Sequence, residues 1–505
     1  MPNLIIQANV PLAVLGTGLA LVALVITAAI IFTVWRRPFI GLGALVAGMA
    51  FHNFFLMLLL RLHTPTALVR VVQGWKELVL LTLAIVAVVQ IVRMRRAGER
   101  WRWIAMDWIA IAFIAILMVY LVLPASLFGG DSNILQRLVA FRVAALIPFL
   151  YFLGRIFSTP RERDLSVVAW LIVGAGAIVA AFGLVELWLV PTADWLGWGV
   201  NLYSSFLGFT YSGPAGLPEN FFQSLPDGLL LRRMVSTYIS PLGIAYTGLL
   251  IVPIAVVLMD RRDQRRRTMA LAIAVSALML TGILFSVTRL ALLALVGEIF
   301  LIAFVLRTRL AWVLPPVVVA CVATILYGYP AVGPTVDPYL LPGESHHHVI
   351  LYIGDPSFTE HLRYLVADSK IVAQHPFGVG LGGSVHRFAE TQNDTAGTGE
   401  SAVFGLFGDV GALGGLLYLA MFGLSIFYGW RAVFRAPRRT LASALPLVAA
   451  VGGLALIPIT LTSDVWGDLS VTFLYWWAAG YAASVALQHT QAVPRETATS
   501  ARQAA

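Results

Sequence analysis

The feature that most limits how this chain can fold is a repeating series of apolar runs. Each run is long enough to be a membrane-spanning helix, which needs about 20 predominantly apolar residues. We therefore expect an all-α fold, a polytopic transmembrane helix bundle of about 12–13 spans, with a large extracytoplasmic loop containing amphipathic helices. The candidate spans lie near 11–35, 39–61, 66–92, 104–125, 138–154, 167–190, 235–259, 268–287, 290–306, 310–328, 401–429, 440–461 and 469–487.

Composition agrees with a membrane protein. Apolar residues make up 59% of the 505 residues and charged residues 12%, whereas a soluble domain is about half apolar and about a quarter charged. The first apolar run is too long for a cleaved signal peptide and has no basic leader. The single cysteine, Cys321, lies in an apolar run. It excludes an internal disulfide framework and a cysteine-based metal site, and we interpret it as a small core residue.

The basic residues indicate how the spans are oriented. The net charge is +9, and 23 of the 34 Lys and Arg lie in one alternate set of loops and in the C-terminal tail. The positive-inside rule places that set in the cytoplasm. With thirteen spans the N-terminus lies outside and the C-terminus inside, and the loss of one weak span would move the N-terminus to the other side. Because the charges follow membrane topology, we predict no nucleic-acid partner.

These predictions divide the chain into six parts. They are N-terminal transmembrane helices at 1–190, a first outer loop at 191–234, transmembrane helices at 235–328, a large outer loop at 329–400, C-terminal transmembrane helices at 401–487, and a cytoplasmic tail at 488–505 that we expect to be disordered.

The large outer loop contains one segment with a helical pattern. Pro376 ends this run, and the following "GVGLGG" predicts a flexible turn. The pattern predicts an amphipathic helix lying on the outer surface. Its apolar positions are Leu362, Leu365, Val366, Ile371 and Val372.

Three arginines at the outer membrane boundary need an explanation. Arg289 lies in "FSVTRLALLAL", and Arg232 and Arg233 lie in "LLLRRMVSTYISPLG". A cation at this depth either snorkels to lipid headgroups or finds an anion, and a guanidinium is well suited to phosphate because its fork matches two oxygens. The "STYISP" that follows predicts hydroxyls and a proline kink inside the next span, where broken backbone lines a cavity.

Other charged groups have plainer interpretations. A solvated helix face accounts for Arg363, on the amphipathic helix. Arg142, inside the fifth span, is expected to face a polar interior or to pair with Glu186 or Asp107, and no sequence argument chooses between these alternatives.

The stretch "TGESAVFGLFGDVGALGG" places two carboxylates where a span begins. An acid in the first turn of a helix favours the helix dipole, so Glu400 has a purely structural interpretation as well as a functional one. Asp409 lies about two and a half turns further along. Capping cannot explain it there, so it must face the bundle interior or water.

Motifs for metals and cofactors are missing from the sequence. The three adjacent histidines His346–His348 do not have the i, i+4 spacing of ligands on one helix face. The sequence has no Walker loop, no dinucleotide fingerprint and no Gly-x-Ser-x-Gly elbow. We therefore expect neither a metal nor a cofactor.

Taken together, four segments resemble motifs of the bacterial O-antigen ligase and O-antigen polymerase superfamily of membrane glycosyltransferases. "RRMVSTYISPLG" is similar to the Arg-x-x-Gly-Thr-Phe segment of that family, Arg289 and Leu293 fit its Arg-x3-Leu pattern, and "HPFGVGLGG" resembles its glycine-rich Pro-Leu-x-Gly-x-Gly-x-Gly segment. The ligase pattern of His, a small polar residue, nine residues and Gly-x-x-Gly is matched by Ser401, Gly411 and Gly414, with Glu400 in place of the His. The resemblance covers the chain from about Arg232 onward.

The resemblance implies a transferase or polymerase that takes a glycan from an undecaprenyl-pyrophosphate donor. Its active site would face the periplasm or cell exterior from the cytoplasmic (inner) membrane, and its acceptor would be a glycan or a lipid. Glu400 would act as general base toward the acceptor hydroxyl, while Arg289 and Arg233 would stabilise the leaving pyrophosphate without a metal. An in-line attack would invert the anomeric centre.

Further substrate contacts follow from the same resemblance. Arg232 and Ser401 border the catalytic candidates in sequence, and the loop 329–400 would cap the site with His375 or Arg363 as weaker contacts. In the first outer loop, aromatic residues could stack on sugars or form an interfacial belt. They are Trp195, Trp198 and Tyr203.

Two other functions compete with this one. A transporter of lipid-linked oligosaccharide or another anionic solute would also use arginines to bind its substrate, but transporters often carry polar breaks at the midplane, whereas the polar outliers here gather at one boundary. A non-catalytic envelope assembly protein would place Glu400, Arg289 and Arg233 far apart.

Overall fold

The computed structural model describes residues 2–211, 213, 216–224, 230–262, 264–334, 356–383, 401–437 and 439–488. Within these ranges nearly all regular structure is helical. The first part of the chain forms α1 (Pro2–Arg36), α2 (Pro38–Arg61), α3 (Thr66–Gln73), α4 (Trp75–Arg96), α5 (Ala105–Val122), α6 (Ile134–Ile156), α7 (Glu162–Leu189), α8 (Asp194–Gly197) and α9 (Val200–Leu207).

A short hairpin separates these helices from the rest of the bundle. Its strands β1 (Phe222–Ser224) and β2 (Leu230–Arg232) pair antiparallel, with Phe222 opposite Arg232. The later helices are α10 (Pro241–Met259), α11 (Arg266–Phe285), α12 (Arg289–Leu306), α13 (Arg309–Val332), α14 (Pro356–Gln374), α16 (Ala402–Arg435), α17 (Ala444–Leu447), the π-helical turn η6 (Val448–Gly452), α18 (Gly453–Thr462) and α19 (Leu469–Gln488).

Twelve helices of the described ranges are long and apolar enough to cross a membrane. They confirm the expected polytopic α-helical chain, with α3 and α4 counted as one span and η5 (Leu441–Ser443) through α18 as another. The thirteenth expected span is present as α19 but is not among the twelve. Its Tyr475, Trp476 and Trp477 are completely buried. Because α19 faces other helices rather than lipid, its surface can be less apolar than that of an outer span.

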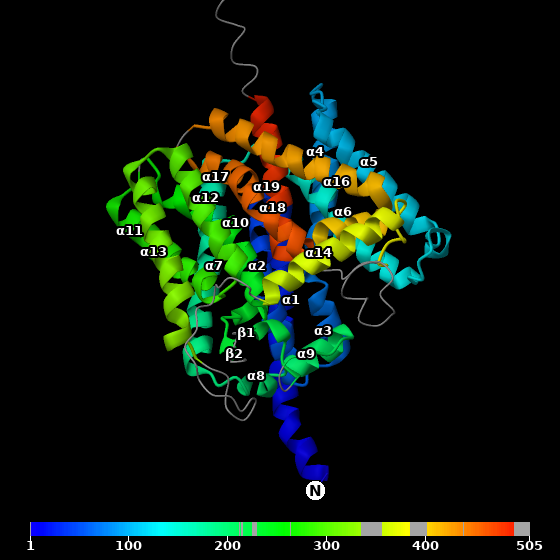
Figure 1. Cartoon of the computed structure of the whole chain (residues 1–505), viewed down its shortest axis with the longest axis vertical. Helices are drawn as coiled ribbons and strands as arrows, with labels where there is room; N and C mark the ends of the chain where they lie inside the picture. Colours follow the sequence, from blue (N-terminus) through cyan, green and yellow to red (C-terminus); the bar gives the residue numbers. More distant parts are fainter. Residues whose placement is uncertain are drawn as a thin grey trace, which may run out of the picture.

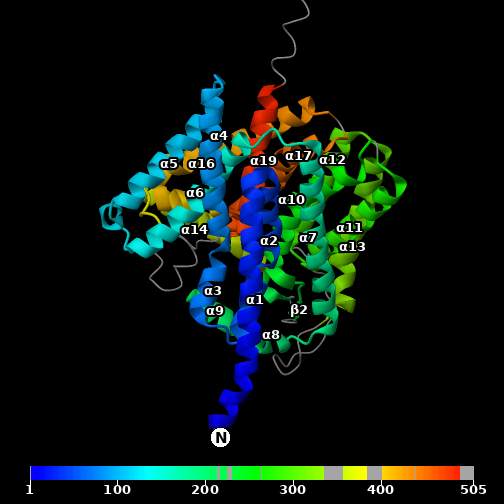
Figure 2. The same ribbon diagram turned by 180° about the vertical axis from the view of Figure 1, so that it is seen from behind.

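The helices are arranged around α19 and α10. Figures 1 and 2 show these two near the middle, with α11 and α13 on one flank and α4 and α5 on the other. The view from behind places α1, α2 and α7 on the near side (Figure 2).

α19 approaches α6 so closely that the two backbones touch. An ideal Cβ added to Gly154 would lie 2.2 Å from the carbonyl oxygen of Trp477, and one added to Gly480 would lie 1.9 Å from that of Tyr151. Both distances are far below any real carbon contact, so glycine is required on both helices. This crossing joins the centre of the bundle to its N-terminal half.

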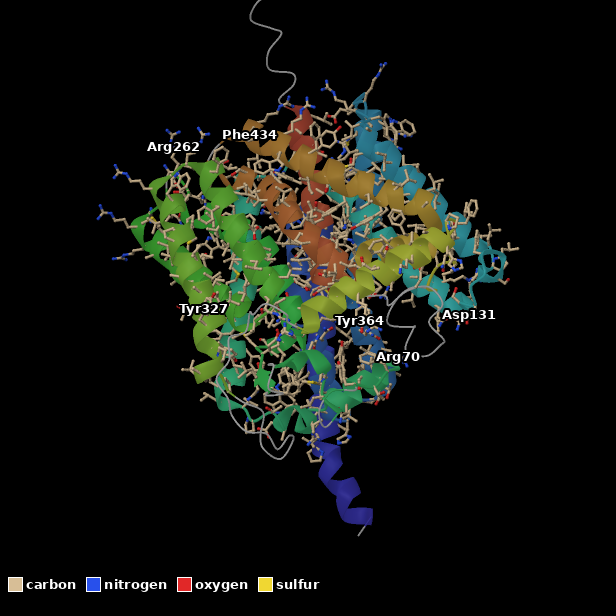
Figure 3. The ribbon with its side chains drawn as sticks, in the orientation of Figure 1. Arg70, Asp131, Arg262, Tyr327, Tyr364 and Phe434 are labelled. Atoms are coloured by element: carbon tan, nitrogen blue, oxygen red, sulfur yellow. The ribbon has the colours of Figure 1, made fainter. Side chains whose placement is uncertain are left out.

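The two ends of the bundle differ. α8, α9 and the hairpin lie at the end toward which the N-terminus points (Figure 1), whereas Arg262 lies at the opposite end (Figure 3). The side of the membrane on which each end stands remains a prediction from the positive-inside rule.

The segment before α10 differs from expectation. "STYISP" does not kink a span; it forms a turn, Ser236–Tyr238, with left-handed backbone at Ser236 and Ile239. α10 then begins at Pro241, and the Ser240 hydroxyl accepts a bond from the amide of Gly243. Proline is favoured in the first helical turn because its missing N–H has no helical partner there, so the break comes at the start of the span.

Candidate functional site

Arg233 is a buried cation whose described partners are all uncharged. Its Nε donates to the Ser286 carbonyl oxygen at 2.8 Å, and its Nη2 donates to Thr288 Oγ1 at 2.8 Å. In the described part of the chain, its Nη1 has no acceptor and no carboxylate lies within ion-pair distance. Burial, with the nearby charge of Arg289, lowers the pKa of Arg233 to about 10, so the group is still cationic at neutral pH.

A second arginine stands close to the first. Arg289 is the first residue of α12 and is half-buried, and the preceding Thr288 is the residue that holds Arg233. The charges of the two arginines act on each other, and the phenols of Tyr246 and Tyr329 oppose the loss of the Arg233 proton. A buried cation that lacks a counter-charge is costly, so Arg233 favours an anionic partner beyond those that the described residues supply.

Arg232 has a different role from its neighbour. Its Nη2 lies 3.1 Å from Glu186 Oε1, and Nη1 donates to the Val190 carbonyl at 2.7 Å. Trp195 also donates to Glu186 Oε1, at 3.2 Å. Arg232 therefore ties the hairpin to the end of α7, and its guanidinium is already engaged by protein groups.

The beginning of α16 lies beside the end of α18. Ser401 caps α16 by accepting from the Phe404 amide at 3.2 Å, and its hydroxyl donates to the Thr460 carbonyl. The Ala402 amide bonds the Ser463 carbonyl at 3.2 Å. Ser463 in turn interacts with Tyr246, which feels the charge of Arg233. The preceding residue, Glu400, lies outside the described residues.

α14 covers this region. It packs against α16 and α18, and Figure 3 shows Tyr364 on it near the middle of the view. A helix forms where the sequence predicted one, but the expected apolar face is not the buried one, because Leu362 and Val366 are exposed while Asp368 is buried. A shallow depression with no room for a ligand lies here, lined by His361, Tyr364, Leu365, Asp368, Ser401, Leu461 and Thr462.

The remaining loop candidates do not line this depression. Arg363 is exposed on α14, and His375, half-buried, directly follows that helix. Trp195 is completely buried and Tyr203 nearly so. Trp195 therefore packs in the protein core rather than stacking on a ligand or forming an interfacial belt.

The glycine-rich segment after α14 contacts the Gly-x-x-Gly segment of α16. α16 is broken at Val410 and Gly411, where Gly411 has φ +70°. The Val379 amide bonds the Gly408 carbonyl at 2.7 Å, and the Ala412 amide bonds the Pro376 carbonyl at 2.8 Å. An ideal Cβ on Gly378 would lie 2.6 Å from the Gly411 amide nitrogen, so the approach requires glycine. We call this contact the glycine clamp.

The other side of the glycine clamp is held by the N-terminal half. Ser132 donates to the Leu381 carbonyl at 2.8 Å, and Tyr120 donates to the Phe377 carbonyl. Val379 and Leu381 are buried. The prediction of a flexible turn is therefore wrong in one respect, because its glycines serve close packing rather than mobility. Asp409 is buried beside the break in α16.

Sequence reasoning missed two acids next to the site. Asp464 and Asp468 lie in the short connection between α18 and α19, "SDVWGDL". Asp468 acts electrostatically on Tyr238 and Tyr246 and lies against Gly243, whose Cβ would be 3.0 Å from Asp468 Oδ2. The sequence signal that could have identified them is the presence of two acids in a short connection between two apolar runs.

No group of three or more metal-ligating side chains occurs within the described ranges, and His346–His348 lie outside them. Comparison with known proteins finds no matching family model and no matching curated protein. The resemblance to O-antigen ligases and polymerases therefore depends on the four motifs themselves.

Proposed function

We propose that this protein is an O-antigen ligase-like or polymerase-like membrane glycosyltransferase. Its donor is a glycan on undecaprenyl pyrophosphate, and its acceptor is a hydroxyl of a glycan or a lipid. The observation that carries the proposal is the buried guanidinium of Arg233, which has no carboxylate partner in the described residues and feels the charge of Arg289. Pyrophosphate supplies the missing negative charge in a form that guanidinium groups bind well.

The reaction needs two kinds of assistance. The acceptor oxygen attacks the anomeric carbon while the bond from that carbon to the pyrophosphate oxygen breaks, so the centre inverts. Glu400 receives the proton of the acceptor hydroxyl, and Arg233 and Arg289 stabilise the charge that develops on the pyrophosphate. These cations perform the role that a divalent metal has in many other transferases.

Two further observations support this assignment. Ala402, two residues after Glu400, donates its amide to the Ser463 carbonyl, and Ser463 interacts with Tyr246 beside Arg233. The glycine clamp brings together two of the motifs on which the family resemblance depends.

The decisive experiment is reconstitution of the purified full-length protein in liposomes with a lipid-linked oligosaccharide. A ladder of products identifies a polymerase, and a single transfer to an added acceptor identifies a ligase. Movement of intact donor across the bilayer, with no new glycosidic bond, would instead identify the transporter.

The role of Glu400 requires its own variant. Glu400→Gln keeps the size and polarity of the side chain but cannot accept a proton, so transfer should be lost while expression is retained. Full activity in this variant would leave Glu400 as a helix cap only, and Arg233 and Arg289 would still be tested by Arg233→Gln and Arg289→Gln.

A further inference from the structure

A buried acid without a described hydrogen-bond partner lies away from the pair Arg233 and Arg289, which we call the arginine site. Glu298 is nine residues after Arg289 on α12, which corresponds to roughly 13 Å along the helix axis. Its side chain is 2% exposed. Neither carboxyl oxygen has a hydrogen-bond partner in the described part of the chain. Most buried polar groups have such partners, so this carboxyl needs an explanation.

No described counter-charge is available at this depth. α12 packs against α10, α11, α13, α18 and η6. η6 and α18 carry no titratable residue, α10 carries only Tyr246, and the basic residues of α11 and α13 stand in their first turns. Those groups are Arg266, Arg267 and Arg309, and α13 also carries Cys321, Tyr327 and Tyr329. An isolated carboxylate here would cost several kcal/mol, whereas a neutral carboxylic acid would not.

The carboxyl faces an irregular turn of backbone. An ideal Cβ on Gly452 would lie 3.9 Å from Glu298 Oε1, and Gly452 is the last residue of the π-helical turn η6. Such turns interrupt the regular i→i+4 ladder and occur frequently at functional sites. A protonated carboxyl has one O–H donor, and a carbonyl released from that ladder is its natural acceptor.

We propose that Glu298 and η6 form an intramembrane proton-binding site. The carboxyl of Glu298 holds its proton at neutral pH, and a rotation of the side chain brings its O–H to a backbone carbonyl of the turn. This bond fixes α12 against η6 and the helix α18 that follows it.

The position of this bond connects it to the arginine site. α12 starts at Arg289, directly after Thr288, which binds Arg233. α18 ends at Thr462, and its Thr460 carbonyl binds Ser401. Glu298 thus acts as a positioning residue for both sides of the site. This consequence rests on the proposed function, whereas the proton-binding site does not.

Infrared spectroscopy of the full-length protein in lipid nanodiscs tests the proton directly. The wild type should show the carbonyl stretch of a protonated carboxylic acid at pH 7, and Glu298→Gln should lose that component. Identical spectra for the two proteins would overturn the proposal, because Glu298 would then be ionised.

A bound cation is the main rival to a bound proton. If Glu298 were ionised and held Na⁺, then replacing choline chloride by sodium chloride would raise the thermal unfolding midpoint of the wild type but not that of Glu298→Gln. We expect no such difference. A sodium-dependent increase confined to the wild type would replace the proton by a cation.

Activity measurements separate positioning from packing. Glu298→Gln retains N–H donors and should keep at least half of the wild-type kcat, whereas Glu298→Leu fills the space without a donor and should lower kcat about tenfold with little change in KM. Equal kcat values for the two variants would exclude the positioning role. If the wild type transfers no glycan at all, the proposed function fails, while the infrared result still decides the proton site.

Discussion

Two buried arginines in this protein have opposite surroundings. Arg155 donates from Nε and Nη2 to both carboxylate oxygens of Asp107, at 3.1 and 2.8 Å, and its guanidinium lies 4.8 Å from the ring centre of Trp101. Arg233 is equally buried, but it contacts only a carbonyl and a hydroxyl among the described residues. The first guanidinium is neutralised within the fold. The second has no carboxylate partner among the described residues, and this difference is the basis for proposing that Arg233 binds an anion whereas Arg155 stabilises the fold.

The contrast between the two arginines requires that Arg155 stabilises the fold. Arg155→Ala would leave the Asp107 carboxylate buried without its cation, and removing one partner of a buried pair costs about 3–5 kcal/mol. We expect a loss of this size in the free energy of unfolding, followed by tryptophan fluorescence in detergent. The double variant Arg155→Met with Asp107→Leu should recover part of the loss because it leaves no charge behind. A double variant no more stable than Arg155→Ala would contradict the pairing argument.

Arg233→Gln should have the reverse effect. Removing a buried charge without a counter-charge should leave stability unchanged or increased, while transfer should fall about 100- to 1000-fold, the range seen when a donor to a developing charge is lost. The measurement compares the transfer rate in the liposome assay with the free energy of unfolding of the same preparation. A variant that unfolds as readily as Arg155→Ala would make Arg233 a structural residue.

Anion binding by the wild type tests directly whether Arg233 binds an anion. Inorganic pyrophosphate at 100 times its dissociation constant should stabilise the fold by about 2.7 kcal/mol. Arg233→Gln should show no such stabilisation, whereas Arg262→Gln, at the opposite end of the bundle (Figure 3), should respond like the wild type. Equal responses in all three proteins would indicate binding elsewhere.

A conservative substitution measures the geometry of the site. Arg233→Lys keeps the charge but loses the planar fork that matches two phosphate oxygens. We expect kcat/KM to fall about tenfold, or about 1.4 kcal/mol. Wild-type activity in this variant would mean that charge alone is sufficient.

The pH dependence is the smallest expected effect. Only the cationic form of Arg233 binds an anion, and its pKa is about 10, so the association constant for sulfate should be constant below about pH 9 and half as large near pH 10. The fold itself behaves oppositely: because burial lowers the pKa of Arg233 in the folded protein below its ordinary value, stability without anion should increase as pH rises above about 10. Subtracting the Arg233→Gln profile isolates both effects.

The sequence predicted the elements of the fold well because apolar runs are local signals. It also singled out Arg233 and Arg289, since a cation beside an apolar span is visible without knowing its neighbours, and the structure brings their charges close enough to interact; their role stays a prediction. The contact partners of these charged side chains were harder to predict, because they depend on which helices pack together. Arg142 was expected to face a polar interior or to pair with Glu186 or Asp107, yet it is exposed and pairs with Glu77 at 3.1 Å.

The remaining differences have the same origin. Trp195 lies in a loop by sequence but is buried because it bonds Glu186 at the end of α7. The glycines around Gly378 suggested flexibility, and only the broken backbone of α16 at Gly411 shows why side chains are excluded there. The general-base role of Glu400 stays a prediction.

The contact between α6 and α19 has a consequence for biosynthesis. α19 follows every other described span in the chain, yet nearly all of it is buried and it touches the backbone of α6 at Gly154 and Gly480. Even Arg155 donates to Ser484 on α19. During synthesis, the surface of α6 that contacts α19 must therefore stay uncovered by other helices until α19 has been made. Insertion of the earlier helices can be sequential, but their final packing must wait until synthesis has passed residue 488.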